Sequence, residues 1–114
     1  MTLEMNHYLE QGVMVVTAEG DINSATAPTF GGHLSNAVDE APNALLVLDM
    51  SKVFYMSSAG LRDIVATLKK AKKQDGDLRL AGIRDRLKPV FDMVGLNSPT
   101  FFYETVDDAV ASYA

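Results

Sequence analysis

Residues 48–61, LDMSKVFYMSSAGL, are the most informative stretch of the sequence. They follow directly on residues 44–48, ALLVL, a run in which every side chain is apolar and none alternates with a polar one. This continuity is typical of a strand that is buried on both faces of a sheet. The stretch therefore leads from a central strand into a loop and then presents two adjacent hydroxyls, Ser57 and Ser58.

A helix is predicted to follow these hydroxyls, because apolar residues from Leu61 to Ala71 recur at helical spacing. It should begin near Ser57 or Ser58 and end before Gly76. The start of a helix has unpaired backbone N–H groups and the positive end of the helix dipole, so a hydroxyl there caps the helix and a phosphate is favoured. Taken alone, Ser58 is most simply interpreted as the N-cap.

Short elements surround this segment on both sides. Residues 4–9 and 13–19 are β-rich runs joined by Gln11-Gly12, which predicts a hairpin at a sheet edge. The remaining elements are predicted from periodicity and capping signals. They are a helix from Ala27 to Val38 capped by Ser24 or Thr26, a strand at 78–81, a helix at 87–94 ended by Gly95, a strand at 100–103 and a helix after Thr105.

This order of elements predicts an α/β fold. We expect one domain over residues 1–114, with a mixed central sheet of four to five strands and about four helices packed on it. The first helix should be soft, because Gly31 and Gly32 lie inside it and each costs up to about 1 kcal/mol relative to alanine.

Composition narrows the classes of function. The net charge of −5 argues against the broad positive field of sequence-independent nucleic-acid binding. The absence of cysteine excludes disulfides and thiolate chemistry and fits a reducing compartment. Neither an apolar run of the roughly 18 residues that span a membrane nor a signal-peptide pattern occurs. We expect a cytoplasmic protein whose partners are proteins or small molecules.

Catalytic motifs are also missing from the sequence. The serines lack the Gly-x-Ser-x-Gly nucleophile elbow, and neither a P-loop nor a Gly-x-Gly-x-x-Gly fingerprint occurs. We therefore expect neither an enzyme nor a bound cofactor.

Three segments, in order, resemble the STAS family, named for sulfate transporters and anti-sigma-factor antagonists. Asp49-Met50-Ser51 and residues 56–61, MSSAGL, match the family's Asp-x-Ser and Met-Asp-Ser-Ser/Thr-Gly-Leu signature. Residues 20–23, GDIN, match its Gly-Glu-Leu-Asp turn, and residues 90–96, VFDMVGL, match its Leu-Phe-x-x-x-Gly-Leu helix end. The resemblance covers nearly the whole chain, and no single motif is specific without the others.

The resemblance implies a phosphorylation-controlled antagonist of an anti-sigma factor. Unphosphorylated members bind the anti-sigma factor, which is itself a serine kinase, and thereby free the sigma factor. The family's phosphoserine falls on Ser58, and a metal-dependent serine phosphatase removes the phosphate. The expected partner-binding residues lie at the helix start and in two neighbouring loops: Asp21, Asn23, Ser24, Phe54, Tyr55, Met56, Ser57, Ser58, Ala59 and Gly60.

The chain departs from the family pattern at three positions. Ser57 replaces the usual aspartate before the phosphoserine, Ala59 replaces a serine or threonine after it, and Asn23 replaces an aspartate of the turn. The site is less negative as a result, and Ser57 becomes a second candidate acceptor. The alternative function is a constitutive stand-alone STAS subunit of a transporter or lipid-trafficking complex, in which Ser58 only caps its helix.

Other polar residues are predicted to be surface residues. His7 and His33 lie far apart in the predicted pattern, one on an edge strand and one on a helix, without the carboxylate spacing of a metal site. The lysines at 69, 70, 72 and 73 are interpreted as a solvated helix face near a helix C-terminus.

Overall fold

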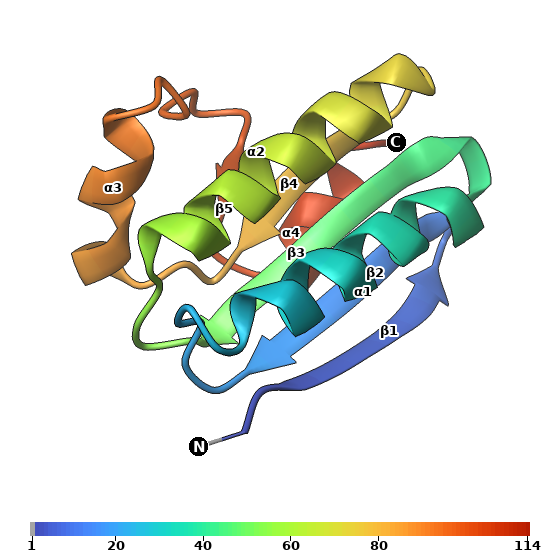
Figure 1. The fold of residues 1–114 in the computed structure, drawn as a ribbon. Helices are drawn as coiled ribbons and strands as arrows, with labels where there is room; N and C mark the ends of the chain where they lie inside the picture. Colours follow the sequence, from blue (N-terminus) through green and yellow to red (C-terminus); the bar gives the residue numbers. More distant parts are fainter. Residues whose placement is uncertain (1) are drawn as a thin grey trace.

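The computed structural model describes residues 2–114, which form one five-stranded sheet with four α-helices (Figure 1). The strand order is β1-β2-β3-β4-β5; β1 runs antiparallel to β2, and all other neighbours are parallel. This confirms the predicted α/β fold with a mixed sheet. The strands are β1 (Glu4–Glu10), β2 (Val13–Glu19), β3 (Leu45–Lys52), β4 (Asp77–Ala81) and β5 (Phe102–Tyr103). The helices are α1 (Ala27–Glu40), α2 (Ser58–Lys73), α3 (Lys88–Asp92) and α4 (Val106–Ala111), with 3-10 turns η1 (Pro42–Ala44) and η2 (Asp85–Leu87).

The predicted hairpin is formed by β1 and β2. Gln11 and Gly12 connect the strands with φ angles of 52° and 81°. Positive φ at both positions of a two-residue turn matches the right-handed twist of the flanking strands. The hairpin places β1 at the edge of the sheet, as expected.

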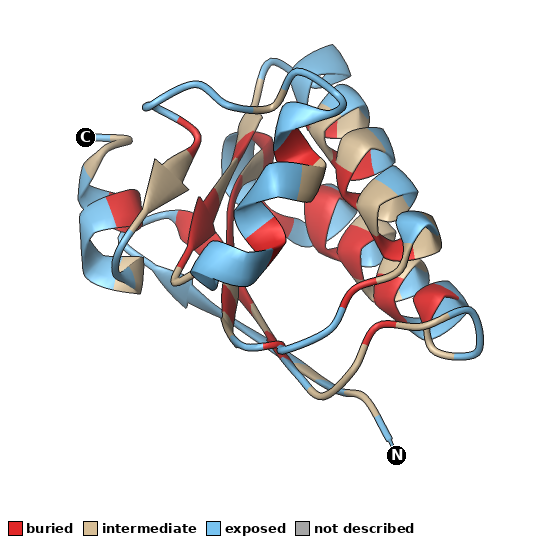
Figure 2. Cartoon of the chain, turned by 90° about the vertical axis from the view of Figure 1, so that its left-hand side faces the viewer, coloured by how far each residue is buried: buried red, intermediate tan, exposed pale blue. Residues whose placement is uncertain are grey.

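Strand β3 is the centre of the core. Leu46, Val47 and Leu48 are fully buried, because α1 and α2 cover one face of the sheet and α4 lies against the other. Figure 2 shows the buried residues concentrated in the central strands and on the helix faces turned toward them. The continuous apolar run therefore indicated its two-sided burial correctly.

The two glycines of α1 have different surroundings. A Cβ added at Gly31 would lie 2.7 Å from Cγ of Asp63 on α2, whereas Gly32 has open space around it. Gly31 thus lets the helices approach at the position of Asp63. Oδ2 of Asp63 is buried with no hydrogen-bond partner in the described residues, and desolvation raises the pKa of this carboxyl group.

Lys70 joins α2 to α1. Its ammonium group donates hydrogen bonds to the carbonyl oxygen and hydroxyl of Ser35, at 3.0 and 2.7 Å, and to Oδ2 of Asp39 at 3.0 Å. The prediction of a uniformly solvated lysine face was wrong for this residue, because α1 packs alongside it. Lys69, Lys72 and Lys73 are exposed as expected.

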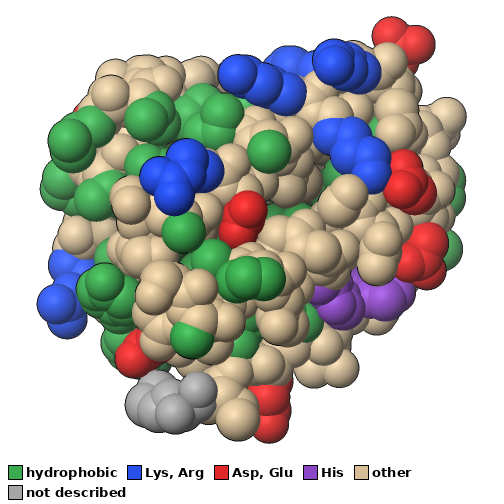
Figure 3. Space-filling view, viewed as in Figure 1, with side chains coloured by type: hydrophobic (Ala, Val, Ile, Leu, Met, Phe, Trp, Pro, Cys, Tyr) green, Lys and Arg blue, Asp and Glu red, His purple; other side chains and the backbone are tan. Residues whose placement is uncertain are grey.

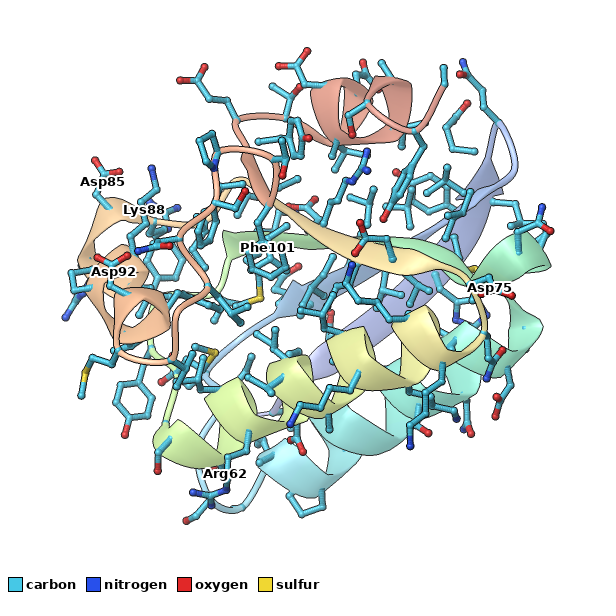
Figure 4. The ribbon with its side chains drawn as sticks, turned by 90° about the horizontal axis from the view of Figure 1, so that it is seen from above. Arg62, Asp75, Asp85, Lys88, Asp92 and Phe101 are labelled. Atoms are coloured by element: carbon cyan, nitrogen blue, oxygen red, sulfur yellow. The ribbon has the colours of Figure 1, made fainter. Side chains whose placement is uncertain are left out.

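The helix predicted at 87–94 is shorter in the structure. It divides into the 3-10 turn η2 and the single helix α3, which ends at Asp92. Gly95 follows with φ 77°, and the N–H of Leu96 reaches back 2.9 Å to the carbonyl oxygen of Phe91. The chain then returns to the sheet, and Phe101 is buried between α3 and the strands (Figure 4).

His7 and His33 are in contact, so the prediction that they lie far apart was wrong. Nδ1 of His7 lies 3.0 Å from Nε2 of His33. The hairpin turns β1 back beside β2, and α1 crosses the same face of the sheet. His7 and His33, which are separated in the sequence by β2 and the loop after it, therefore meet at the sheet edge.

Candidate functional site

Two loops of the candidate site leave the carboxyl ends of neighbouring parallel strands. The segment after β2 and the segment after β3 lie at the same edge of the sheet, and they pair through backbone hydrogen bonds. The N–H of Ile22 donates to the carbonyl oxygen of Tyr55 at 3.0 Å, and the N–H of Ser57 donates to that of Ile22 at 2.7 Å. An isolated parallel bridge also joins Ile22 to Met56. The structure thus brings the two predicted loops together.

The two hydroxyls differ in their surroundings. Ser57 is the N-cap of α2, half-buried, with extended backbone and with its Oγ accepting from the N–H of Gly60 at 3.4 Å. Ser58 is the first residue of the helix and is exposed. The interpretation of Ser58 as the cap was therefore wrong by one residue, because the helix begins at Ser58 and the cap precedes it.

The electrostatic environment of Ser58 suits an anion. The first turn of α2 contains no acidic residue, and its N–H groups carry the positive end of the helix dipole. Arg62 lies one turn further along the helix, where i and i+4 side chains are neighbours, and it is exposed. Figure 4 shows its side chain directed away from the body of the protein.

Asn23 stabilises its own turn. Its Oδ1 accepts hydrogen bonds from the N–H groups of Ala25 and Thr26, at 2.9 and 3.0 Å, and the Thr26 hydroxyl donates to the carbonyl oxygen of Asp21 at 2.8 Å. Asp21 and Asn23 are half-buried, whereas Ser24 is exposed. The amide of Asn23 thus supports the turn, and the exposed Ser24 is available to a partner.

Aromatic side chains project from the loop after β3. Phe54 and Tyr55 are 50% and 51% exposed. The guanidinium of Arg84 lies 3.8 Å from the centre of the Phe54 ring and donates a 3.0 Å hydrogen bond to the carbonyl oxygen of Ser51. These contacts hold the loop and leave half of each ring in solvent.

An apolar cavity of about 330 Å³ opens between the start of α2 and α3. Its lining includes Met56, Leu61 and Val90, and it reaches both serines. Met93 and Val94, which directly follow α3, also line it and are 84% and 48% exposed. In Figure 3, hydrophobic side chains gather on the side of the molecule formed by α3 and the start of α2.

The contribution of α3 to the candidate site was not predicted from the sequence. Leu87, Val90, Phe91 and Val94 fit the apolar face of the predicted helix, so the pattern indicates burial for Val94, which is 48% exposed in the structure, and it assigns no role to Met93. The available signal was Met93, an apolar residue that lies off the helical pattern and two residues before Gly95. Met56 is buried, with 7% of its surface exposed, so we define the docking surface as the exposed residues Phe54, Tyr55, Ser58, Met93 and Val94.

Gly60 lies where the first turn of α2 packs closely against the two loops. A Cβ at this position would lie 2.6 Å from Cγ2 of Ile22 and 2.8 Å from Cγ of Met56. The glycine therefore lets the first turn of α2 approach the paired loops. Ala59, beside it, is half-buried against the core.

Within the described residues, neither a cluster of three metal-binding side chains nor a membrane-spanning helix is found. No group of three or more His, Cys, Asp or Glu residues in the described part of the chain is placed to hold a metal ion. No helix within residues 2–114 is long and apolar enough to cross a bilayer.

Comparison with known proteins gives consistent matches over most of the chain. The STAS domain model matches residues 4–109. The anti-sigma-B factor antagonist of Bacillus subtilis is 35% identical over 81 residues, which are 71% of this chain and 72% of that protein. An anti-sigma factor antagonist from Mycobacterium paratuberculosis has a similar structure, with a TM-score of 0.84 at 29% identity over 97% of this chain and 93% of that one.

A more distant structure has the same fold. The phosphorylated form of SpoIIAA, a Bacillus cell fate determinant, has a TM-score of 0.76 at 14% identity, over 99% of this chain and 100% of that one. The family model and the Bacillus subtilis relative together decide the assignment. The chain belongs to the STAS domain family, within its group of anti-sigma factor antagonists.

Proposed function

We propose that this protein is a phosphorylation-controlled antagonist of an anti-sigma factor, with Ser58 as the phosphate acceptor. In its unphosphorylated form it binds the anti-sigma factor, which is also its serine kinase, through the docking surface. A serine phosphatase restores the binding-competent form. We also propose a cytoplasmic location, where sigma factors act.

The observation that carries this proposal is the difference between Ser57 and Ser58. The Ser57 hydroxyl is half-buried and occupied in capping α2, whereas Ser58 is exposed one residue later. A kinase needs an accessible hydroxyl, so the geometry favours Ser58 over Ser57. That SpoIIAA, a protein with this fold, has been solved in a phosphorylated form is consistent with the proposal.

The mechanism follows from what a phosphate does to its surroundings. It adds about −1.5 to −2 charges and three acceptor oxygens beside the apolar cavity. A partner that packs apolar side chains on Met93 and Val94 would have to desolvate this dianion, which is unfavourable without new cationic contacts. The helix dipole stabilises the phosphate in the free protein. Binding is therefore lost while the fold is retained.

The alternative is a constitutive accessory subunit of a transporter or lipid-trafficking complex. In that role the docking surface would bind its partner irrespective of Ser58 chemistry. The identity of the bound protein and its response to Ser58 substitution distinguish the two roles.

Affinity capture from the native cell tests the proposal. Wild-type protein, Ser58→Ala and Ser58→Asp are used as baits, and bound proteins are identified by mass spectrometry. We expect an ATP-binding anti-sigma factor with wild type and Ser58→Ala, strongly depleted with Ser58→Asp. Recovery of a membrane transporter in equal amounts with all three baits would instead support the accessory-subunit role.

A further inference from the structure

The chain has two histidines, and they are in contact with each other. His7 comes from β1 and His33 from α1, so two separately fixed elements position the pair. Nδ1 of His7 lies 3.0 Å from Nε2 of His33, and the ring planes are inclined by 64°. Figure 3 shows the two side chains together on the surface, away from the hydrophobic side of the molecule.

We propose that His7 and His33 form a binding site for a divalent transition metal ion such as Zn²⁺ or Ni²⁺, with Nδ1 of His7 and Nε2 of His33 as ligands. Imidazole nitrogen is a preferred ligand of these ions. Two nitrogens that each lie about 2.0–2.1 Å from one ion are roughly 2.9–3.4 Å apart for angles between 90° and tetrahedral. The observed 3.0 Å separation falls within this range, so the two nitrogens already have the spacing of two ligands of one ion, and both lone pairs would turn toward the ion in place of the direct contact between the rings.

Glu40 supplies an outer contact to the same pair. Its Oε1 lies 3.7 Å from Nε2 of His7, the ring nitrogen that does not face His33. Ligating histidines commonly direct their second nitrogen toward a carboxylate, which fixes the ring orientation and increases its basicity. Glu40 is therefore a positioning residue, and His7 is the ligand that it orients.

The site is open to solvent. The His7 side chain is 35% exposed, and no third protein ligand converges on the pair in the described residues. Water would complete the coordination shell of the bound ion. This arrangement suits reversible, moderate-affinity binding and places the metal on the edge of the sheet, apart from the docking surface.

Calorimetric titration of the untagged full-length protein with NiCl₂ and ZnCl₂ at neutral pH, in a non-coordinating buffer, tests the proposal. We expect one ion per chain and a rise in thermal unfolding temperature on metal addition. His7→Gln and His33→Gln should each raise the dissociation constant by at least roughly tenfold and abolish the thermal shift, and Glu40→Gln should raise it by a smaller factor.

Glu10→Gln is the matched control. Like Glu40→Gln, it removes one negative charge, in this case from β1. Glu10 is three residues from His7, and side chains alternate along a strand, so Glu10 points to the face of the sheet opposite to His7. Its metal affinity should equal that of the wild type. Absence of saturable binding up to millimolar metal, or binding by both histidine variants with the affinity of the wild type, would overturn the proposal and leave a simple hydrogen-bonded histidine pair.

Discussion

The backbone N–H of Ser57 donates a 2.7 Å hydrogen bond to the carbonyl oxygen of Ile22. This bond fixes the N-cap of α2 to the turn that follows β2. Since Ser58 is the next residue along the chain, its position relative to that turn is set by the backbone and not by its own side chain. The hydroxyl of Ser58 is thus free for modification, and substituting it need not disturb the fold.

Substitution of the two serines separates capping from modification. We expect Ser57→Ala to lower the free energy of unfolding by about 0.5–2 kcal/mol, because it removes the cap on the N–H of Gly60. Ser58→Ala should change it by no more than about 0.5 kcal/mol, as at other exposed positions. Urea unfolding of both variants measures the difference. A larger loss from Ser58→Ala than from Ser57→Ala would contradict the assignment of the cap.

The end of α3 is expected to contribute to partner binding. Met93→Ser should weaken binding of the anti-sigma factor by roughly tenfold or more, the loss expected for an apolar anchor at an interface. It should leave thermal stability unchanged, because Met93 is 84% exposed. Leu9→Ser is the matched control, since Leu9 is also an exposed apolar residue but lies on β1. Equal loss from both variants would show that the docking surface is misplaced.

The partly buried carboxylate of Asp63, whose Oδ2 is shielded from solvent, predicts a pH-dependent stability. Its raised pKa means that the folded state holds the proton more tightly than the unfolded state, so the ionised group destabilises the fold at neutral pH. This destabilisation is relieved as the pH falls through the raised pKa toward the unfolded value. Asp63→Asn should therefore be more stable than wild type at neutral pH, and the advantage should shrink on acidification.

Urea unfolding at neutral pH and near the ordinary aspartate pKa of about 3.9 measures this effect. Asp92→Asn, at an exposed position on α3, controls for the change in net charge. A stability difference between Asp63→Asn and wild type that does not vary with pH would contradict the account.

The sequence predicted the order of elements well because its signals were local. The apolar run before Asp49 and the Gln11-Gly12 turn each identify an element without knowledge of its neighbours. The position of the cap was missed by one residue, because two adjacent serines satisfy the same capping rule. Only the backbone bond from Ser57 to Ile22 distinguishes them.

Long-range contacts were the other source of error. His7 meets His33, and Lys70 reaches Ser35, only because the sheet brings β1, α1 and α2 together. Met93 lines the same cavity as Ser58 for the same reason, since the tertiary fold places α3 near the start of α2. Periodicity within one element carries no information about which other element lies opposite.

The central claim is that phosphate on Ser58 blocks an otherwise competent docking surface. Calorimetric titration of the anti-sigma factor with wild type, Ser58→Ala and Ser58→Asp tests it most directly, with thermal unfolding of each variant as the check on folding. We expect Ser58→Ala to bind like wild type and Ser58→Asp to be equally stable but to bind at least roughly tenfold more weakly. A well-folded Ser58→Asp protein that binds with undiminished affinity would contradict the phosphorylation switch.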